Sequence, residues 1–332
     1  MVRATLVGMA ARDTAVLRFL AAPTDAGRTG TVDGGRVLEW IDKAAYACAV
    51  GWSRSYCVTA YVGNIHFDRP VCVGDMVEVV AKIVHTGRSS MHIRVEVASA
   101  DPRAEGVVLK DTCLIIMVAV DGEGRPTPVP QWAPETEHER GQQAVTRRRI
   151  ALRNRIEELM AEQKYTDEGT AEETVLRFLA APTDINWGGK VHGGTAMRWI
   201  DEAAYVCGSR WAGRPVIAVY AGGVRFYRPM HIGHLVELRA RLIHTAARGL
   251  HISVNCFSGD PATGQLQLTT NCLMVMVALD DEGHALPARP WEPVSQEDRD
   301  LDAFARELVR LRAEFPDSFQ QVDPTVSRLP GA

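Results

Sequence analysis

The feature that most constrains this chain is an internal repeat. The segment VLRFLAAPTD occurs at residues 16–25 and again at 175–184. A shift of 159 residues aligns 16–132 with 175–291 without a gap, and 50 of the 117 aligned positions are identical. The unit is as long as a domain and occurs twice, so it indicates a duplication and not a solenoid. Two related units in one chain predict a covalent pseudo-dimer.

The repeat divides the chain into regions of different character. Apolar residues two to four positions apart predict a helix over 145–164 between the units, and a similar pattern predicts one over 298–315 after the second unit. Each unit is therefore expected to end in a helix that packs against it. The expected regions are a first domain (1–132), a helical linker (133–174), a second domain (175–292) and a C-terminal helix with a tail (293–332).

Within the first unit, the pattern predicts one long helix followed by strands. Residues 34–52 carry apolar side chains at helical spacing around most of the helix, so a large surface must bury it. We expect an α+β fold in which an antiparallel sheet wraps a central helix in each unit. Alternating and β-branched apolar residues predict the strands, at 14–22, 56–62, 63–67, 76–86, 90–99 and 107–120.

Composition argues against several classes of partner. Lys plus Arg number 37 and Asp plus Glu number 41, so the net charge is −4. This near balance does not indicate the basic surface that binds nucleic acid or an anionic membrane. Apolar runs such as 113–120 are far shorter than the roughly 18–20 residues of a membrane-spanning helix. The seven cysteines lack CxxC spacing, which favours reduced, buried thiols. We expect a cytoplasmic protein that binds neither nucleic acid nor membranes.

Particular strings then resemble the acyl-CoA thioesterase branch of the hotdog superfamily. The strings F-x-R-P-V-x-V-G-D at 67–75 and T-G-x-S-S-M at 86–91 resemble that branch. The resemblance covers both units, about seven-tenths of the chain, and is closest to the tandem brain-type acyl-CoA hydrolases, whose single-hotdog relatives are bacterial. The pattern P-x-D-x-N-x-x-G-x-x-x-G-G-x-x-x-x-W-x-D is complete in the second unit, at Pro182, Asp184, Asn186, Gly189, Gly193, Gly194, Trp199 and Asp201.

This resemblance implies two tandem hotdog domains that hydrolyse acyl-CoA thioesters to a free acid and CoA. It also implies a homo-oligomer, a trimer of pseudo-dimers. CoA is part of the substrate, so we expect no separate cofactor, and no metal-binding motif such as HExxH occurs. Hotdog folds also host other functions, so a dehydratase or hydratase and a non-catalytic acyl-CoA-binding module stay open as alternatives.

A Gly-Gly pair opens the predicted helix of each unit. Gly34-Gly35 and Gly193-Gly194 place backbone N–H groups at a helix N-terminus, where the dipole favours developing negative charge. The absence of side chains would let a thioester carbonyl approach these N–H groups closely. The alternative is that the glycines serve only close packing between helix and sheet.

Asp42 and Asp201 each lie eight residues after the first glycine of the pair. A carboxylate on such an apolar helix is costly to bury unless it is used or paired. The resemblance implies that the catalytic carboxylate lies at this position, either as a general base on water or as a nucleophile. The alternative is a surface aspartate paired with Lys or Arg.

Asn186 has no counterpart in the first unit, where Gly27 takes its place. In the tandem relatives, the Asn of one hotdog and the Asp of the other form a composite site, in which the Asn orients water or the carbonyl. The resemblance therefore pairs Asn186 with Asp42, whereas Asp201 faces Gly27. We expect one working site and one degenerate site. Two neighbours of Asn186, Trp187 and His192, also differ between the units, and each could serve the site or only the loop.

The turn that resembles a CoA-binding element is asymmetric as well. Gly87, Arg88, Ser89 and Ser90 offer N–H groups, hydroxyls and a guanidinium to phosphate or pantetheine. The second copy has lost both serines and keeps a shifted Arg248. An ordinary hairpin turn is the alternative, and the sequence does not say which turn serves which aspartate.

Overall fold

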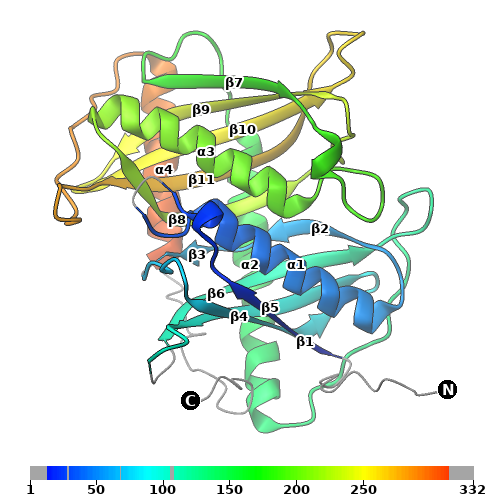
Figure 1. The fold of residues 1–332 in the computed structure, drawn as a ribbon. Helices are drawn as coiled ribbons and strands as arrows, with labels where there is room; N and C mark the ends of the chain where they lie inside the picture. Colours follow the sequence, from blue (N-terminus) through cyan, green and yellow to red (C-terminus); the bar gives the residue numbers. More distant parts are fainter. Residues whose placement is uncertain (1–12, 28–29, 68, 105–107, 314–332) are drawn as a thin grey trace.

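The computed structural model describes residues 13–27, 30–67, 69–104 and 108–313 (Figure 1). The two units have the same order of elements, except that one strand of the second unit takes the place of two in the first, and this confirms the predicted α+β fold. The first unit contains β1 (Thr14–Leu20), α1 (Gly34–Ser53), β2 (Cys57–Val62), β3 (Ile65–His66), β4 (Met76–Thr86), β5 (Ser90–Ala100) and β6 (Val108–Ala119). The second contains β7 (Glu173–Leu179), α3 (Gly193–Ala212), β8 (Val216–Phe226), β9 (Leu235–Thr245), β10 (Gly249–Gly259) and β11 (Gln267–Ala278). The tail after Ala313 lies outside the described residues.

The strands of both units join into one sheet. Among the described residues it has eleven strands, in the order β1-β4-β5-β6-β2-β8-β11-β10-β9-β7, with β3 paired to β8. The seam is the antiparallel pair of β2 and β8, where Tyr61 lies opposite Arg225 and Val62 opposite Val224. Continuous backbone hydrogen bonding across the seam fixes the position of one unit against the other.

Helices α1 and α3 lie side by side on the same face of this sheet (Figure 1). Their backbones approach closely because a glycine lies at each crossing. A Cβ on Gly35 would lie 2.8 Å from the Cα of Arg198, and one on Gly194 would lie 2.7 Å from the Cα of Glu39. The second glycine of each pair therefore does serve packing, as the alternative interpretation held, although it packs helix against helix.

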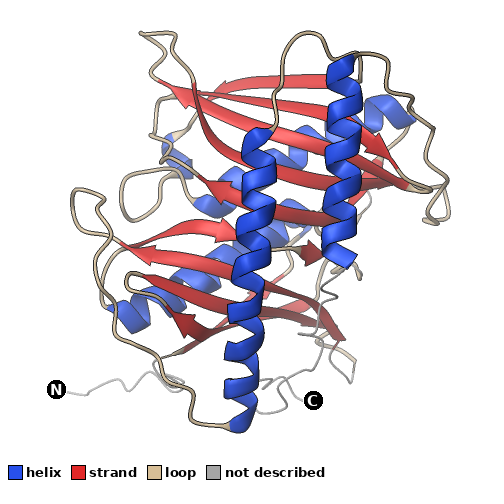
Figure 2. Ribbon diagram, turned by 180° about the vertical axis from the view of Figure 1, so that it is seen from behind, coloured by secondary structure: helices blue, strands red, loops and turns tan. Residues whose placement is uncertain are grey.

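Two further helices, α2 (Glu137–Glu162) and α4 (Gln296–Ala313), cross the opposite face of the sheet (Figure 2). The prediction that each unit ends in a packing helix is confirmed, since Ile156 and Met160 of α2 and Leu301 and Leu308 of α4 are buried in a common apolar cluster. Helix α2 spans both units: Glu139 pairs with Lys82 at 3.0 Å and Glu157 pairs with Arg225 at 2.6 Å.

Helix α2 begins eight residues before the predicted start at residue 145. Thr136 and Glu139 form a capping box there: the Thr136 hydroxyl accepts from the Glu139 N–H, and the Glu139 carboxylate accepts from the Thr136 N–H. The T-x-x-E string was visible in the sequence, but the polar stretch around it hides the helical apolar period that a sequence analysis follows.

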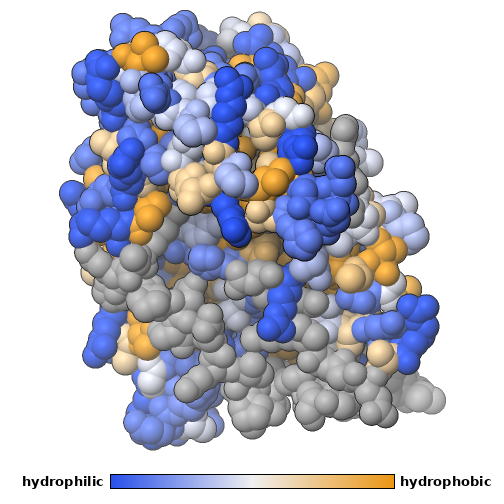
Figure 3. Space-filling view, turned by 90° about the vertical axis from the view of Figure 1, so that its left-hand side faces the viewer, coloured by the Kyte–Doolittle hydropathy of each residue, from blue (hydrophilic) through white to orange (hydrophobic). Residues whose placement is uncertain are grey.

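No helix among the described residues is long and apolar enough to cross a bilayer. On the face drawn in Figure 3, hydrophilic side chains alternate with smaller apolar areas. All seven cysteines are free thiols, and six of them are buried, as their positions in apolar segments predicted.

Candidate active site

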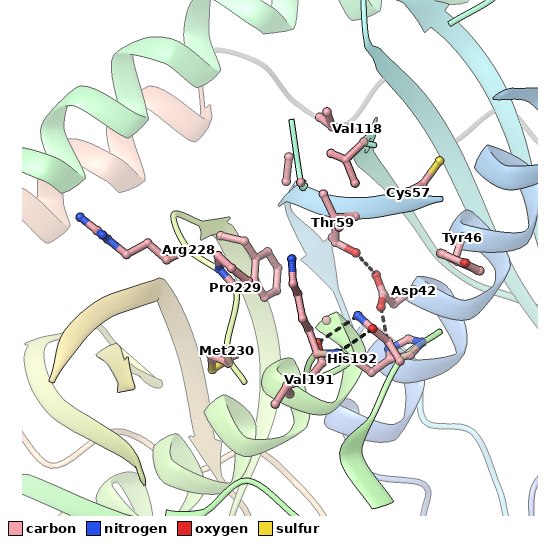
Figure 4. A pocket seen from close by; sticks show the side chains of 18 of the residues that line it. Asp42, Tyr46, Cys57, Thr59, Val118, Val191, His192, Arg228, Pro229 and Met230 are labelled. Carbon is pink, nitrogen blue, oxygen red and sulfur yellow. Dashed lines mark hydrogen bonds and ion pairs between the residues drawn. The ribbon is translucent and has the colours of Figure 1, made fainter. Parts of the chain in front are cut away.

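Asp42 lies on α1 with its carboxylate buried between the two units. Its side chain is 2% exposed. Oδ2 accepts the backbone N–H of Gly194, at the start of α3, at 2.8 Å. Oδ1 accepts the hydroxyl of Thr59 on β2 at 2.6 Å (Figure 4). Asp42 therefore contacts the second unit, and hydrogen bonds from two directions hold the carboxylate in place.

His192 is a further partner of this carboxylate. It is the N-cap of α3, and its Nδ1 lies 2.9 Å from Asp42 Oδ2. The same Nδ1 accepts the backbone N–H of Gly194 at 3.1 Å, so one backbone donor faces both the imidazole and the carboxylate. Asp42 and His192 are thus in close contact across the boundary between the units.

Asn186 lies on the loop that leads to His192 and borders the same cavity as Asp42. Its side-chain oxygen is occupied, because Oδ1 accepts the backbone N–H of Gly188 at 2.9 Å and that of Lys190 at 3.1 Å. Its Nδ2 makes a long 3.4 Å contact with the carbonyl of Val191, and the side chain also lies against the Tyr56 hydroxyl. The Asn186 amide therefore shapes the loop through its oxygen and meets Val191 and Tyr56 at the border of the cavity.

The loop of the second unit rests on tyrosines of the first. The Trp187 ring stacks on the Tyr46 ring of α1, with centroids 4.6 Å apart and planes 6° apart. A Cβ on Gly188 would lie 2.2 Å from the Tyr56 ring, so only glycine fits there. Trp187 is nevertheless 70% exposed, because its other face is open. Aromatic contacts across the units thus hold the loop over Asp42.

These residues border a cavity of about 290 Å³. Part of its wall is apolar, formed by residues such as Val58, Val118 and Phe226. Two cations, Lys190 and Arg228, also line it, and neither has an ion-pair partner among the described residues. The cavity thus combines a buried carboxylate, an amide donor, an apolar wall and two unneutralised positive charges.

The pseudo-symmetric site around Asp201 differs in almost every partner. Gly35 donates its N–H to Asp201 Oδ2 at 3.1 Å, as Gly194 does to Asp42. Ala218 stands in place of Thr59, and Oδ1 of Asp201 has no hydrogen-bond partner among the described residues. Burial, together with the nearby charges of Asp33 and Glu202, raises the pKa of Asp201 to about 7.

The position opposite Asn186 in this second site has no room for a side chain. A Cβ on Gly27 would lie 1.8 Å from Asp33 Oδ1, so the Asp33 carboxylate fills that space. Asp33 also replaces His192 as the residue before the Gly-Gly pair, and burial raises the pKa of its carboxyl. Asp201 therefore faces a carboxyl group where Asp42 faces an imidazole.

The predicted Gly-Gly pairs divide between two roles. The N–H groups of Gly35 and Gly194 donate to the aspartates. Of the four glycines, Gly34 and Gly193 therefore keep an N–H that could meet a carbonyl, and Gly193 borders the cavity.

The predicted CoA-binding turn Gly87–Ser90 lies outside the cavity wall. It joins β4 to β5, and Ser90 is the register partner of the cavity residue Val118. The turn at Arg248 holds the equivalent position in the second unit.

Thr59 is a partner of Asp42 that the sequence did not reveal. Its signal was available, because the 159-residue shift places Ala218 opposite it. Threonine is common in β-strands because of its strand propensity, so its presence in a predicted strand did not indicate a contact with Asp42.

Comparison with known proteins fits this architecture. The family model described as the thioesterase superfamily matches twice, at residues 29–105 and 188–265, once in each unit. Protein VdlD of Helicobacter pylori is 32% identical over 133 residues, which cover 40% of this chain and 76% of VdlD. This chain belongs to the thioesterase superfamily. The prediction of a tandem hotdog member of a thioesterase family is thereby confirmed.

Other thioesterase superfamily members match one unit or both. The human cytosolic acyl coenzyme A thioester hydrolase is 23% identical over 295 residues, covering 83% of this chain and 77% of that protein. The crystal structure of an apo-hexameric acyl-CoA thioesterase is 33% identical and covers 46% of this chain and 96% of its own, with a TM-score of 0.43.

Proposed function

We propose that this protein hydrolyses acyl-CoA thioesters, and that a single composite site around Asp42 performs the reaction. The observation that carries the proposal is that Asp42 of the first unit and Asn186 and His192 of the second border one cavity. The names of the relatives, which include acyl-CoA hydrolases that match over most of this chain, support the substrate class. The Asp201 site is the degenerate copy.

In the proposed reaction, Asp42 acts as a general base. It takes a proton from a water molecule whose oxygen attacks the thioester carbonyl carbon. The Asn186 Nδ2 and the Gly193 N–H stabilise the negative charge that develops on the carbonyl oxygen. The carbon–sulfur bond then breaks, and the CoA thiolate takes the proton, so that the products are a free acid and CoA. His192 and Thr59 orient the Asp42 carboxylate.

The CoA part is proposed to enter along the Lys190 side of the cavity. Lys190 and Arg228 carry positive charges without partners among the described residues, and CoA carries phosphates that need such charges. The turn Gly87–Ser90 follows the same edge, one strand away from Val118. This arrangement assigns that turn to the Asp42 site and the Arg248 turn to the Asp201 site.

Thiol release tests the reaction and its alternatives. We expect free CoA from a panel of acyl-CoA substrates with wild type, and none above background with Asp42→Ala. Water addition to an enoyl-CoA without thiol release would instead support a hydratase, and binding without turnover would support a binding module. Either result would contradict the proposal.

Isotope labelling can reveal a nucleophilic Asp42. In a single turnover in H₂¹⁸O, a general base gives product that carries ¹⁸O. A nucleophilic Asp42 would form a mixed anhydride, and attack of water on its aspartyl carbonyl would leave unlabelled side-chain oxygen in the first product, whereas attack on the acyl carbon would label the product. We expect labelled product, and unlabelled product would overturn the role of general base.

We further propose that three chains assemble in the cytoplasm. Leu20 on β1 and Leu179 on β7 are 60% and 58% exposed at the two outer strands of the sheet, and such edges favour association. The relative described as hexameric matches one unit of this chain, so six of its units correspond to three tandem chains. The mass in solution tests this assembly, and a monomer would contradict it. The human relative named cytosolic supports the location.

A further inference from the structure

A second, wider cavity lies beside the loop that carries Asn186. Its volume is about 650 Å³. Arg36, Glu39 and Lys43 form one stripe of α1 along it, and Thr195 and Arg198 of α3 complete the wall between the helices. We call it the ionic cavity because five of its eleven lining residues are Arg, Lys, Asp or Glu, although Ile185 and Trp187 also line it.

The two cavities meet at the reaction centre. Both are bordered by the same three residues, Asn186, Trp187 and His192. A thioester carbonyl held at this junction must send its CoA arm to one side and its acyl arm to the other. The cavity with Lys190 and Arg228 suits the CoA arm, which leaves the ionic cavity for the acyl arm.

We propose that the ionic cavity selects short acyl groups whose far end carries an oxygen that accepts a hydrogen bond, and that Lys43 binds this oxygen. The inference rests on the proposed acyl-CoA hydrolysis. It concerns which acyl groups the Asp42 site accepts, and it leaves the reaction itself unchanged.

The charges along the cavity explain why a long alkyl chain is a poor ligand. Arg36 pairs with Asp25 at 2.9 Å and Arg198 pairs with Glu39 at 3.0 Å, so the walls hold fixed ion pairs. An alkyl chain laid against α1 and α3 would displace water from these charged groups, and the large apolar side chains of the lining, Ile185 and Trp187, lie only on the loop. The usual gain of about fourfold in affinity per buried methylene is therefore not expected here.

Lys43 is the cation of this cavity that has no partner. The Arg36 and Arg198 guanidinium groups are held in ion pairs, whereas Lys43 makes no ion pair or hydrogen bond among the described residues. It is half-buried and directly follows Asp42 on α1. The pseudo-equivalent residue Glu202 is paired with Arg198 at 2.8 Å. An ammonium group beside the reaction centre with three free donors needs an oxygen acceptor.

Matched substrates test the inference directly. Pentanoyl-CoA, 5-hydroxypentanoyl-CoA and glutaryl-CoA have five acyl carbons and differ only in a terminal methyl, hydroxyl or carboxylate. We expect kcat/KM at least fivefold higher for one or both oxygen-bearing substrates, and no rise in kcat/KM from hexanoyl- to decanoyl-CoA. Lys43→Met should reduce the advantage of the oxygen-bearing substrate at least fivefold, and Lys43→Arg should keep most of it.

Three outcomes would overturn the inference. One is a preference for pentanoyl-CoA, and another is a kcat/KM that rises about fourfold per methylene. The third is that Lys43→Met weakens inhibition by free CoA as strongly as it weakens turnover of glutaryl-CoA, because the ionic cavity would then hold the CoA arm. If no substrate releases thiol, the proposed hydrolysis itself is wrong. A failure of the proposed hydrolysis can therefore be distinguished from a failure of the proposed acyl selectivity.

Discussion

The Asp42 and Asp201 sites start from the same helix and the same Gly-Gly pair, but they differ in what surrounds the carboxylate. Asp42 meets a threonine hydroxyl, an imidazole and a backbone N–H. Among the described residues, Asp201 keeps only the backbone N–H of Gly35. The fold needs the glycines and the helices in both copies, because they allow α1 and α3 to pack. The Asp42 copy alone of the two carries the additional polar partners, on which the proposed reaction depends.

This difference shows how a duplicated unit divides its tasks. The differences between the units gather on one side: the loop with Asn186, Trp187 and His192 belongs to the second unit, and Thr59 and Tyr56 belong to the first. Each unit therefore contributes to the Asp42 site residues that its counterpart lacks. The Asp201 site has retained a carboxyl group whose neighbours no longer use it.

The largest expected effect comes from removing each carboxylate in turn. Asp42→Asn should lower kcat by about a thousandfold, because the general base is lost. Asp201→Asn is the matched control at the pseudo-equivalent position, and it should leave kcat within about threefold. Thiol release under saturating substrate measures both variants. Equal losses of kcat in the two variants would show two working sites. A loss confined to Asp201→Asn would show that the reaction takes place at Asp201 and would contradict the assignment to Asp42.

The second effect concerns stability and pH. Burial raises the pKa of Asp201 to about 7, well above about 3.9 in an unfolded chain. Between about pH 4 and 7, the folded state therefore keeps a proton on Asp201 that the unfolded state has lost. The free energy of unfolding consequently falls as the pH rises through this range. Asp201→Asn should exceed wild type in stability by roughly 2–4 kcal/mol at pH 8, and the gap should close towards pH 4.

Urea unfolding at a series of pH values tests this expectation. A gap that is constant with pH would mean that the Asp201 carboxyl does not titrate in this range. Activity measured on the same samples separates stability from catalysis, since Asp201→Asn should remain active at each pH.

The third effect reproduces the Asp201 environment at the working site. Thr59→Ala removes a hydrogen bond to a buried carboxylate, which is worth about 1.5–3 kcal/mol, so kcat should fall about 10- to 100-fold. The reverse change, Ala218→Thr, should not increase activity, because Gly27 and Asp33 still replace Asn186 and His192. A gain of activity in Ala218→Thr would mean that the threonine alone distinguishes the two sites.

The smallest effect concerns the aromatic contact between the units. Trp187→Ala removes a ring stack worth about 0.5–1.5 kcal/mol, so kcat/KM should fall about two- to tenfold. Tyr46→Leu should have a similar effect, and the double variant should lose little more than either single variant. Additive losses would show that Trp187 acts on the substrate directly and not through Tyr46.

Much of the fold was predictable from the sequence because it depends on local and repeated signals. The 159-residue repeat established two units, and the apolar period placed α1 and β4 with nearly correct ends. The start of α2 was placed eight residues too late, because a polar first turn held by Thr136 and Glu139 carries no apolar period. The pairing of β2 with β8 into one sheet was not predicted, because no local pattern records which edges meet.

The sequence by itself determined that this protein has two related units and that the Asn186 and Gly27 positions differ. Only the tertiary structure decided that the hydroxyl of Thr59 and the ring of His192 reach the same carboxylate, that Trp187 stacks on Tyr46, and that the Asn186 oxygen is used by its own loop. The reason is physical. A duplication leaves its record in residue identity along the chain, whereas hydrogen bonds and ring stacks depend on which surfaces meet when α1 and α3 pack together.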